Sequence, residues 1–210
     1  MSSTTKKKIR RICVICSVKF ETYDLRKKWC SSEHGYEYAM QLKAKQQAKN
    51  NAILEEARET TSDLRHKLQT EINKLIRAID YGQPCISCGV LKQHMEAGHY
   101  HHKSKNSASE CTFHLWNLSA QCKYCNRFQN GNLSKYGQSI ERIYGEEIYN
   151  LLHDLPIMYR GLNWGKDELK EFIRVAKLIN KSMPKQEVYS TEKRIELRSK
   201  FNNQLKIYTI

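Results

Sequence analysis

Two Cys-x2-Cys pairs frame the stretch of the chain whose residues are best suited to do chemistry. They are Cys85 with Cys88 and Cys122 with Cys125, at the spacing Cys-x2-Cys-x33-Cys-x2-Cys. Each pair at this spacing forms a knuckle with two thiolates, and two knuckles complete a tetrahedral four-sulfur shell for Zn²⁺. Because that shell leaves no open position for a substrate, we predict a structural zinc site that joins the two ends of the stretch.

A second set of candidate zinc ligands lies near the N-terminus. Its members follow the spacing Cys-x2-Cys-x13-Cys-x3-His and are Cys13, Cys16, Cys30 and His34. Three thiolates and one imidazole also make a closed tetrahedral site. A unit this small does not persist without its metal, so we predict a second structural zinc.

The framed stretch contains a carboxylate, an imidazole and two amides. These are Glu96, His99, Asn117 and, directly after the last Cys, Asn126. Residues 93–102 are predicted to form a hairpin strand, whose alternating side chains would place His99 and His101 on the same face. A His followed by two Asn residues within paired Cys-x2-Cys motifs resembles the HNH (ββα-metal) nucleases, in which a hairpin supplies a His and a short helix supplies a metal ligand.

The resemblance narrows to one family. The runs Ala97-Gly98-His99-Tyr100 and Gly131-Asn132-Leu133, together with the two cysteine pairs, are similar to the NinG (Rap) family of lambdoid-phage recombination endonucleases. The N-terminal cysteine unit and the long helical linker fit that family too. The likeness therefore covers roughly residues 10–180 in layout, with its specific motifs between residues 85 and 133.

The resemblance implies a role for each of these residues in phosphodiester hydrolysis. His99 would be the general base that takes a proton from the attacking water. Asn126 would bind a catalytic Mg²⁺ or Mn²⁺, ions that prefer oxygen ligands and stabilise the developing charge, and Glu96 is the nearest carboxylate for a second ligand. Asn117 is expected to hold the loop or to orient the His through a backbone hydrogen bond.

One position departs from the HNH pattern. Many HNH enzymes place an acidic or His ligand immediately before the catalytic His, where this sequence has Gly98. Glu96 must then reach the ion from another point on the hairpin, or His101 must help. The residues alone leave both arrangements open.

The charge balance favours a nucleic-acid partner. The formal net charge is +14, and each Lys or Arg that approaches a phosphate releases condensed counterions. A ribosome-surface or membrane-surface protein is the alternative that charge alone does not exclude. Four basic residues around the site are expected to contact phosphates: Lys103, Lys105, Lys123 and Arg127.

The sequence has no apolar run long enough for a membrane span, and no apolar segment follows its N-terminal basic residues. We therefore expect no membrane partner and a cytoplasmic protein, located in the host cytoplasm if it is phage-encoded. In that reducing compartment, metal binding is a better use of cysteine than disulfides. Cys111, which lies outside both motifs, is expected to be a buried thiol.

The predicted fold is α+β and mainly helical, in five parts. These are a basic arm (1–12), a zinc finger (13–35), a helical connector (36–82), an HNH core with the four-cysteine zinc (83–135) and a helical C-terminal region (136–210). In the connector, Thr61-Ser62-Asp63 is predicted to cap a second helix, whose apolar stripe would serve core packing or a homodimer seam. The C-terminal helices are predicted at 139–155, ended by Pro156, at 163–181, and after a Thr191 cap.

We therefore expect a metal-dependent, structure-selective DNA endonuclease that acts on branched recombination intermediates such as Holliday junctions and D-loops. The preference for branched DNA rests on the resemblance alone. Two alternatives remain: an HNH nickase or site-specific duplex endonuclease, and a non-catalytic zinc-ribbon DNA-binding protein. Phage or host recombination proteins are further expected partners.

Overall fold

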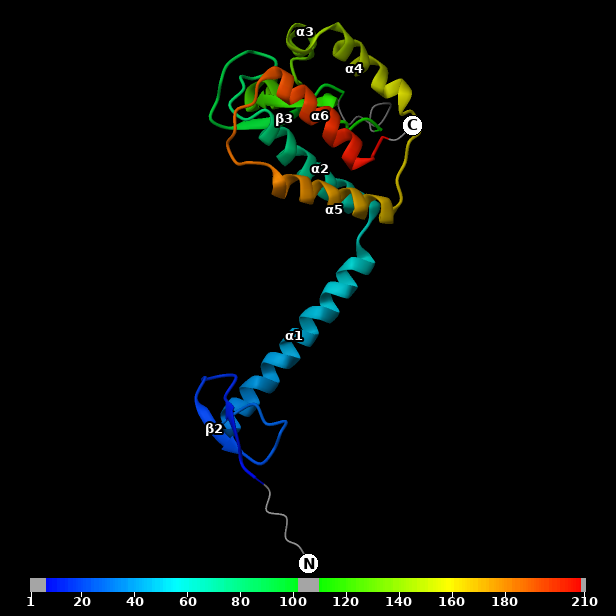
Figure 1. Cartoon of the computed structure of the whole chain (residues 1–210). Helices are drawn as coiled ribbons and strands as arrows, with labels where there is room; N and C mark the ends of the chain where they lie inside the picture. Colours follow the sequence, from blue (N-terminus) through cyan, green and yellow to red (C-terminus); the bar gives the residue numbers. More distant parts are fainter. Residues whose placement is uncertain (1–6, 102–109, 209–210) are drawn as a thin grey trace, which may run out of the picture. The chain divides into compact units, whose positions relative to one another are not determined.

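The structure, a computed structural model, describes residues 7–101 and 110–208, and it is α+β and mainly helical as expected (Figure 1). The chain divides into two compact units, Met1–Glu59 and Thr60–Ile210, and each is described by itself. The boundary falls inside the predicted connector at 36–82, next to Thr61-Ser62-Asp63, where the sequence predicts the start of a second helix. Among the described residues, no helix has both the length and the apolar character needed to cross a membrane.

The N-terminal unit is a hairpin followed by one long helix. β1 (Ile9–Ile12) pairs antiparallel with β2 (Lys19–Thr22), so the predicted basic arm is wrong for its last four residues, which form a strand. α1 (Ser32–Arg58) begins after Ser31, whose hydroxyl accepts a hydrogen bond from the His34 N–H and so caps the helix. None of the residues of α1, all of which are described, is buried, in agreement with its polar sequence.

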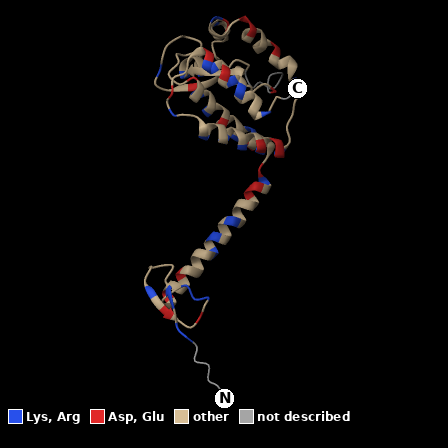
Figure 2. Cartoon of the chain, viewed as in Figure 1, with Lys and Arg blue, Asp and Glu red and all other residues tan. Residues whose placement is uncertain are grey.

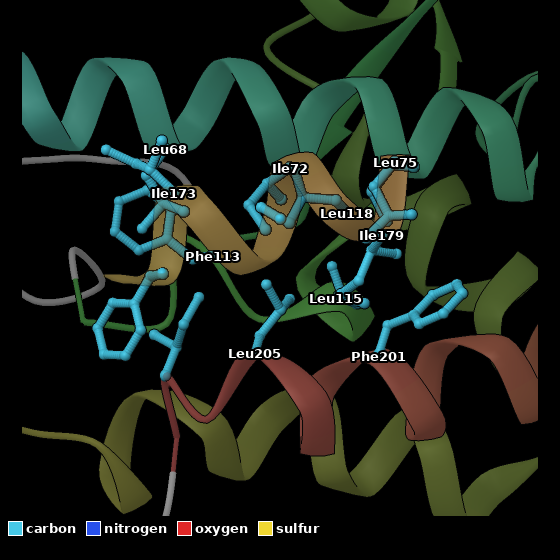
Figure 3. Close-up of a cluster of buried hydrophobic side chains, with 14 of the residues drawn as sticks. Leu68, Ile72, Leu75, Phe113, Leu115, Leu118, Ile173, Ile179, Phe201 and Leu205 are labelled. Atoms are coloured by element: carbon cyan, nitrogen blue, oxygen red, sulfur yellow. The ribbon is translucent and has the colours of Figure 1, made fainter. Parts of the chain in front are cut away.

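The core of the C-terminal unit is built on α2 (Thr61–Ile79). A capping box between Thr60 and Asp63 starts this helix, one residue before the cap that the sequence predicts. Its apolar stripe packs against α5 (Lys166–Ser182) and against apolar side chains from other parts of the unit (Figure 3). The stripe consists of residues at most 2% exposed: Leu64, Leu68, Ile72, Leu75, Ile76 and Ile79. Core packing is therefore its role, and the predicted dimer seam along this helix is wrong because the chain itself covers the stripe.

A two-stranded antiparallel sheet packs on α2. β3 (Met95–His99) pairs with β4 (Leu118–Cys122), which puts Glu96 opposite Gln121. The 3₁₀ turn η1 (Leu115–Asn117) leads into β4, and the π-helical turn η2 (Tyr124–Phe128) follows it. Because β3 ends at His99, well short of residue 102, the prediction that His99 and His101 share one strand face is wrong.

Two short helices follow the sheet. α3 (Leu133–Tyr144) and α4 (Glu146–Met158) are separated at Gly145. α3 starts well before residue 139, the predicted start, and Pro156 lies inside α4 instead of ending it. Proline has no N–H to donate to the carbonyl four residues earlier. His101 Nε2 donates to that carbonyl, Leu152 O, across 2.7 Å. The His101 ring thus takes the place of the missing helix bond.

The last two helices differ from their predictions by a few residues at their ends. α5 begins at Lys166 rather than residue 163, and α6 (Thr191–Leu205) is capped by Ser190 rather than Thr191. The apolar stripe of α5 is buried against the core: Leu169, Phe172, Ile173, Ala176 and Ile179. The stripe therefore packs within its own chain.

A buried ion pair joins α6 to the end of α2 and to β4. Arg198 is fully buried and donates to both carboxylate oxygens of Asp80, at 3.0 and 2.8 Å. Arg198 also donates to the carbonyls of Leu115 and Leu118, and Asp80 accepts the Ala120 N–H. A buried charge is tolerated when it is paired and its hydrogen bonds are satisfied, as here.

Replacing Arg198 by Met is expected to lower the free energy of unfolding by up to about 3–5 kcal/mol, because the buried Asp80 carboxylate loses the partner that donates to both of its oxygens and keeps only the longer ion pair with Arg194 at 3.6 Å. Urea denaturation followed by circular dichroism measures the change. The matched control is Lys193→Met on the same helix, whose exposed pair with Glu196 is expected to contribute less than about 1 kcal/mol. Equal losses in the two variants would contradict this role of the buried pair.

Candidate metal centres and catalytic site

The four cysteines that frame the central stretch come together in the C-terminal unit. Their sulfur atoms all lie within 4.8 Å of one another, and the Cys88 and Cys122 Sγ atoms are 3.8 Å apart. Zinc–sulfur bonds of about 2.3 Å in a tetrahedron require sulfur separations of about 3.8 Å, so the cluster fits zinc. Burial and the neighbouring thiols raise the pKa of Cys125 to about 12. Four ionised thiols in this space therefore need the charge of a cation.

Backbone contacts hold the two knuckles in place. Gly89, at φ +71°, donates its N–H to Cys85 O and closes the first knuckle in a conformation that favours glycine. The Ile86 N–H bonds to Ala120 O of β4, and the second knuckle begins at Cys122, the last residue of β4. The sheet thus positions both halves of the predicted zinc site.

The N-terminal unit holds the second cluster. The ligand atoms of its four members also lie within 4.8 Å of one another. His34 Nδ1 is 3.1 Å from Cys30 Sγ and 3.8 Å from Cys13 Sγ, and Cys16 Sγ is 3.6 Å from Cys30 Sγ. Because Ser31 caps α1, the first turn of that helix carries His34 to the thiols. Both predicted ligand sets are therefore assembled, and each could hold one zinc ion.

Glu96 and Asn126, the two predicted ligands of a catalytic ion, lie in contact. Glu96 on β3 accepts a hydrogen bond from Asn126 Nδ2 on η2, with 2.7 Å between the atoms. It also accepts one from Arg127 Nε at 3.0 Å. Burial opposes ionisation of Glu96, but the hydrogen bonds and charge of Arg127 and Asn126 outweigh it and hold the pKa of Glu96 below its usual value. The cluster therefore carries an ionised carboxylate next to an amide.

His99 is the last residue of β3, and its side chain leaves the strand on the face opposite to that of Glu96. Side chains alternate along a strand, so Glu96 and Gly98 share one face while Ala97 and His99 share the other. Ala97 is buried in the core on that second face. The strand therefore does not place His99 beside Glu96, as the simplest form of the predicted site would require.

The structure supplies a reason for the glycine at position 98. A Cβ atom there would lie 2.0 Å from Gln121 Oε1 and 2.9 Å from Gln121 Cβ. Gln121 is fully buried, and its Nε2 donates to Ser87 Oγ and to Gly131 O, so it cannot move aside. Any side chain at position 98 would displace this amide. Glu96, two residues earlier on the same face, is then the carboxylate available to an ion.

Asn117 clamps the backbone just beyond His99. It is fully buried, its Oδ1 accepts the His101 N–H at 2.8 Å, and its Nδ2 donates to the carbonyls of His101 and Cys111. These bonds agree with the expectation that Asn117 holds the loop. The His101 ring is directed to α4 through its bond to Leu152 O, so its predicted help in the Glu96 site is not supported.

The remaining predicted residues have mixed outcomes. Lys123 is exposed, as a phosphate contact must be, whereas the guanidinium of Arg127 already binds Glu96, a pairing that spacing in the sequence did not reveal. Cys111 is buried as expected, and burial raises its pKa to about 11. Lys103 and Lys105 lie outside the described residues.

Comparison with known proteins establishes the family. The model of the family described as Bacteriophage Lambda NinG protein matches residues 5–187. The chain belongs to the NinG family. Among its NinG relatives, protein ninG of Escherichia phage 933W is 29% identical over 160 residues, which cover 67% of this chain and 79% of the relative.

Two further NinG proteins extend this likeness. Protein ninG of Escherichia phage lambda is 28% identical over 68% of this chain and 76% of its own length. Protein ninG of Salmonella phage P22 is 31% identical over 55% of this chain and 66% of its own length. No solved structure matches the chain.

Proposed function

We propose that this NinG-family chain is a metal-dependent DNA endonuclease with an HNH-type core formed by β3, β4 and η2. The observation that carries the proposal is the contact between Glu96 and Asn126, 30 residues apart in sequence and 2.7 Å apart in space. It unites a carboxylate from a hairpin and an amide from the helical turn that follows the zinc knuckle. HNH nucleases, which the motifs resemble, likewise take ligands for their ion from a hairpin and a short helix.

Glu96 and Asn126 would hold Mg²⁺ or Mn²⁺ through oxygen atoms, which these ions prefer. When bound, the ion supplies charge stabilisation at the phosphate and the leaving oxygen. His99 takes the proton from the attacking water, and Asn117 fixes the backbone that follows His99. We place the scissile phosphate across the end of β3, where Glu96 lies on one face of the strand and His99 on the other.

Basic residues in both units would bind the DNA backbone. Lys123 is exposed beside the proposed site. Along α1, Lys43, Lys45 and Lys49 lie in the middle of the helix, and its Glu residues lie toward both ends (Figure 2). The excess of positive charge, +14 over the chain, supports binding to a polyanion. Following the resemblance, we propose branched recombination intermediates such as Holliday junctions and D-loops as substrates.

A panel of DNA substrates tests the proposal. Zinc-loaded protein is incubated with four-way junctions, D-loops, flaps and linear duplex of unrelated sequences, with Mg²⁺, Mn²⁺ or neither. We expect ion-dependent cutting of the branched forms and little cutting of the duplex. Cutting of one duplex sequence would favour the site-specific alternative. Binding without cutting under every condition would favour the zinc-ribbon alternative and overturn the proposal.

A further inference from the structure

Two aromatic rings stand exposed on η2, next to the proposed catalytic residues. The side chains of Tyr124 and Phe128 are 63% and 69% exposed, and their rings stack with centroids 6.2 Å apart and planes inclined by 27°. Single exposed apolar residues are common on protein surfaces. Two rings already stacked on each other form an ordered apolar surface, and such a surface on a charged protein indicates a binding site.

The zinc cluster fixes the direction of these rings. Cys125, between them in sequence, is buried in the four-cysteine cluster, and Asn126 is bound to Glu96. With these two residues directed inward, Tyr124 and Phe128 are left on the outer side of the turn, together with exposed Lys123. The rings therefore lie beside the proposed metal ligands and next to the positive charge of Lys123.

We propose that Tyr124 and Phe128 form a stacking platform for an unpaired nucleobase, and that this platform selects branched over fully paired DNA. Aromatic rings bind the faces of bases regardless of sequence, and flanking cations bind the phosphates that connect them. In a continuous duplex the bases are covered by their neighbours, whereas a branch point exposes base faces. A base on the platform would lie against residues two positions from Asn126 in the chain, which brings the adjoining phosphate toward Glu96.

This inference rests on the proposed action on DNA and deepens it by naming what distinguishes the substrate. The charge beside the rings supports a nucleic-acid occupant over a second copy of this chain, since two such copies would bring the Lys123 ammonium groups of both together. Binding of another protein or of a second copy of this chain at the rings is an alternative outcome, which the molecular mass detects.

The test uses Tyr124→Leu/Phe128→Leu, which keeps apolar side chains but removes both rings. Flap DNA carrying 2-aminopurine at the branch point is titrated with zinc-loaded protein without added Mg²⁺ or Mn²⁺, so that binding is read without cutting. We expect wild-type protein to quench the branch-point base and to leave a 2-aminopurine inside paired duplex unchanged. The double variant should lose the quenching and bind the flap roughly tenfold more weakly for each ring lost, with unchanged duplex affinity.

The matched control is Tyr36→Leu, which removes a 71% exposed ring from α1 in the other unit and should leave quenching intact. Zinc content and circular dichroism establish that each variant is folded.

Unchanged flap binding, an equal loss for flap and duplex, or a change of molecular mass in the double variant would each overturn the platform. If wild-type protein quenches the base but never cuts DNA, the nuclease proposal fails and the platform stands. If it cuts branched DNA and the double variant behaves like wild type, only the platform fails.

Discussion

Replacing the exposed Cys88 by Ser is expected to destabilise the C-terminal unit more than replacing the fully buried Cys111 by Ser. For residues that act only through packing the order would be the reverse, since an exposed side chain contributes little to a core. Cys88 differs because its sulfur completes a four-thiolate shell. Structural zinc binding is worth on the order of 10–16 kcal/mol in small domains, so loss of one ligand is expected to cost several kcal/mol. Burying a serine hydroxyl in place of the Cys111 thiol is expected to cost about 1–3 kcal/mol.

Metal analysis and urea denaturation of wild type and of the variants provide the measurement. Wild type and Cys111→Ser should each retain two zinc ions per chain, and Cys88→Ser should retain one. The remaining ion belongs to the N-terminal cluster, so Cys16→Ser should also leave one ion but spare the C-terminal unit. If Cys111→Ser proves the more damaging change and zinc content is equal in all variants, the four cysteines are packing residues and the metal centre is refuted.

Replacing His99 by Ala is expected to slow ion-dependent cutting of branched DNA by about 10²–10⁴-fold, the usual contribution of a general base. Glu96→Gln should lose cutting too, because a neutral amide holds Mg²⁺ less well than a carboxylate. Neither change should affect zinc content or DNA affinity measured without added Mg²⁺ or Mn²⁺. Single-turnover cleavage assays give the rates.

His94→Ala is the matched control for this pair. His94 is an exposed imidazole directly before β3, so its loss removes a His from the same segment without touching the proposed site. Its cutting rate should equal that of wild type. If the His99→Ala protein cuts normally, His99 is not the general base. The two outcomes are distinguishable because β3 places the His99 side chain on the face opposite Glu96.

Local spacing explains what could be predicted from sequence. Both zinc ligand sets can be predicted from the sequence because a knuckle needs its cysteines three positions apart, independently of how the rest of the chain folds. The helices and their buried faces followed from a periodicity of 3.6 residues, confirmed by the stripe of α2 and α5. Their ends were less predictable, since a cap at Thr60 or Ser190 depends on single hydrogen bonds.

Contacts between distant parts of the chain depend on how the elements pack. Asp80 and Arg198, 118 residues apart, meet in the core, and neither belongs to a motif. The same holds for the His101 ring, whose place at Leu152 depends on a proline in another helix. Periodicity shows that a helix has a buried face but not which element covers it. From its sequence the α2 stripe could equally face a dimer partner, whereas in the structure α5 covers it.

At the candidate site, the sequence alone predicts the types of the ligands and their order along the chain, which runs from Cys85 through Glu96 and His99 to Asn126. Packing determines which of them meet. Glu96 joins Asn126 because η2 directly follows β4, the strand that pairs with β3, and position 98 is glycine because the buried amide of Gln121 fills the space of a side chain. Residue types and short spacings set local chemistry, whereas proximity across 30 residues exists only once the sheet has formed and has brought the two cysteine pairs together.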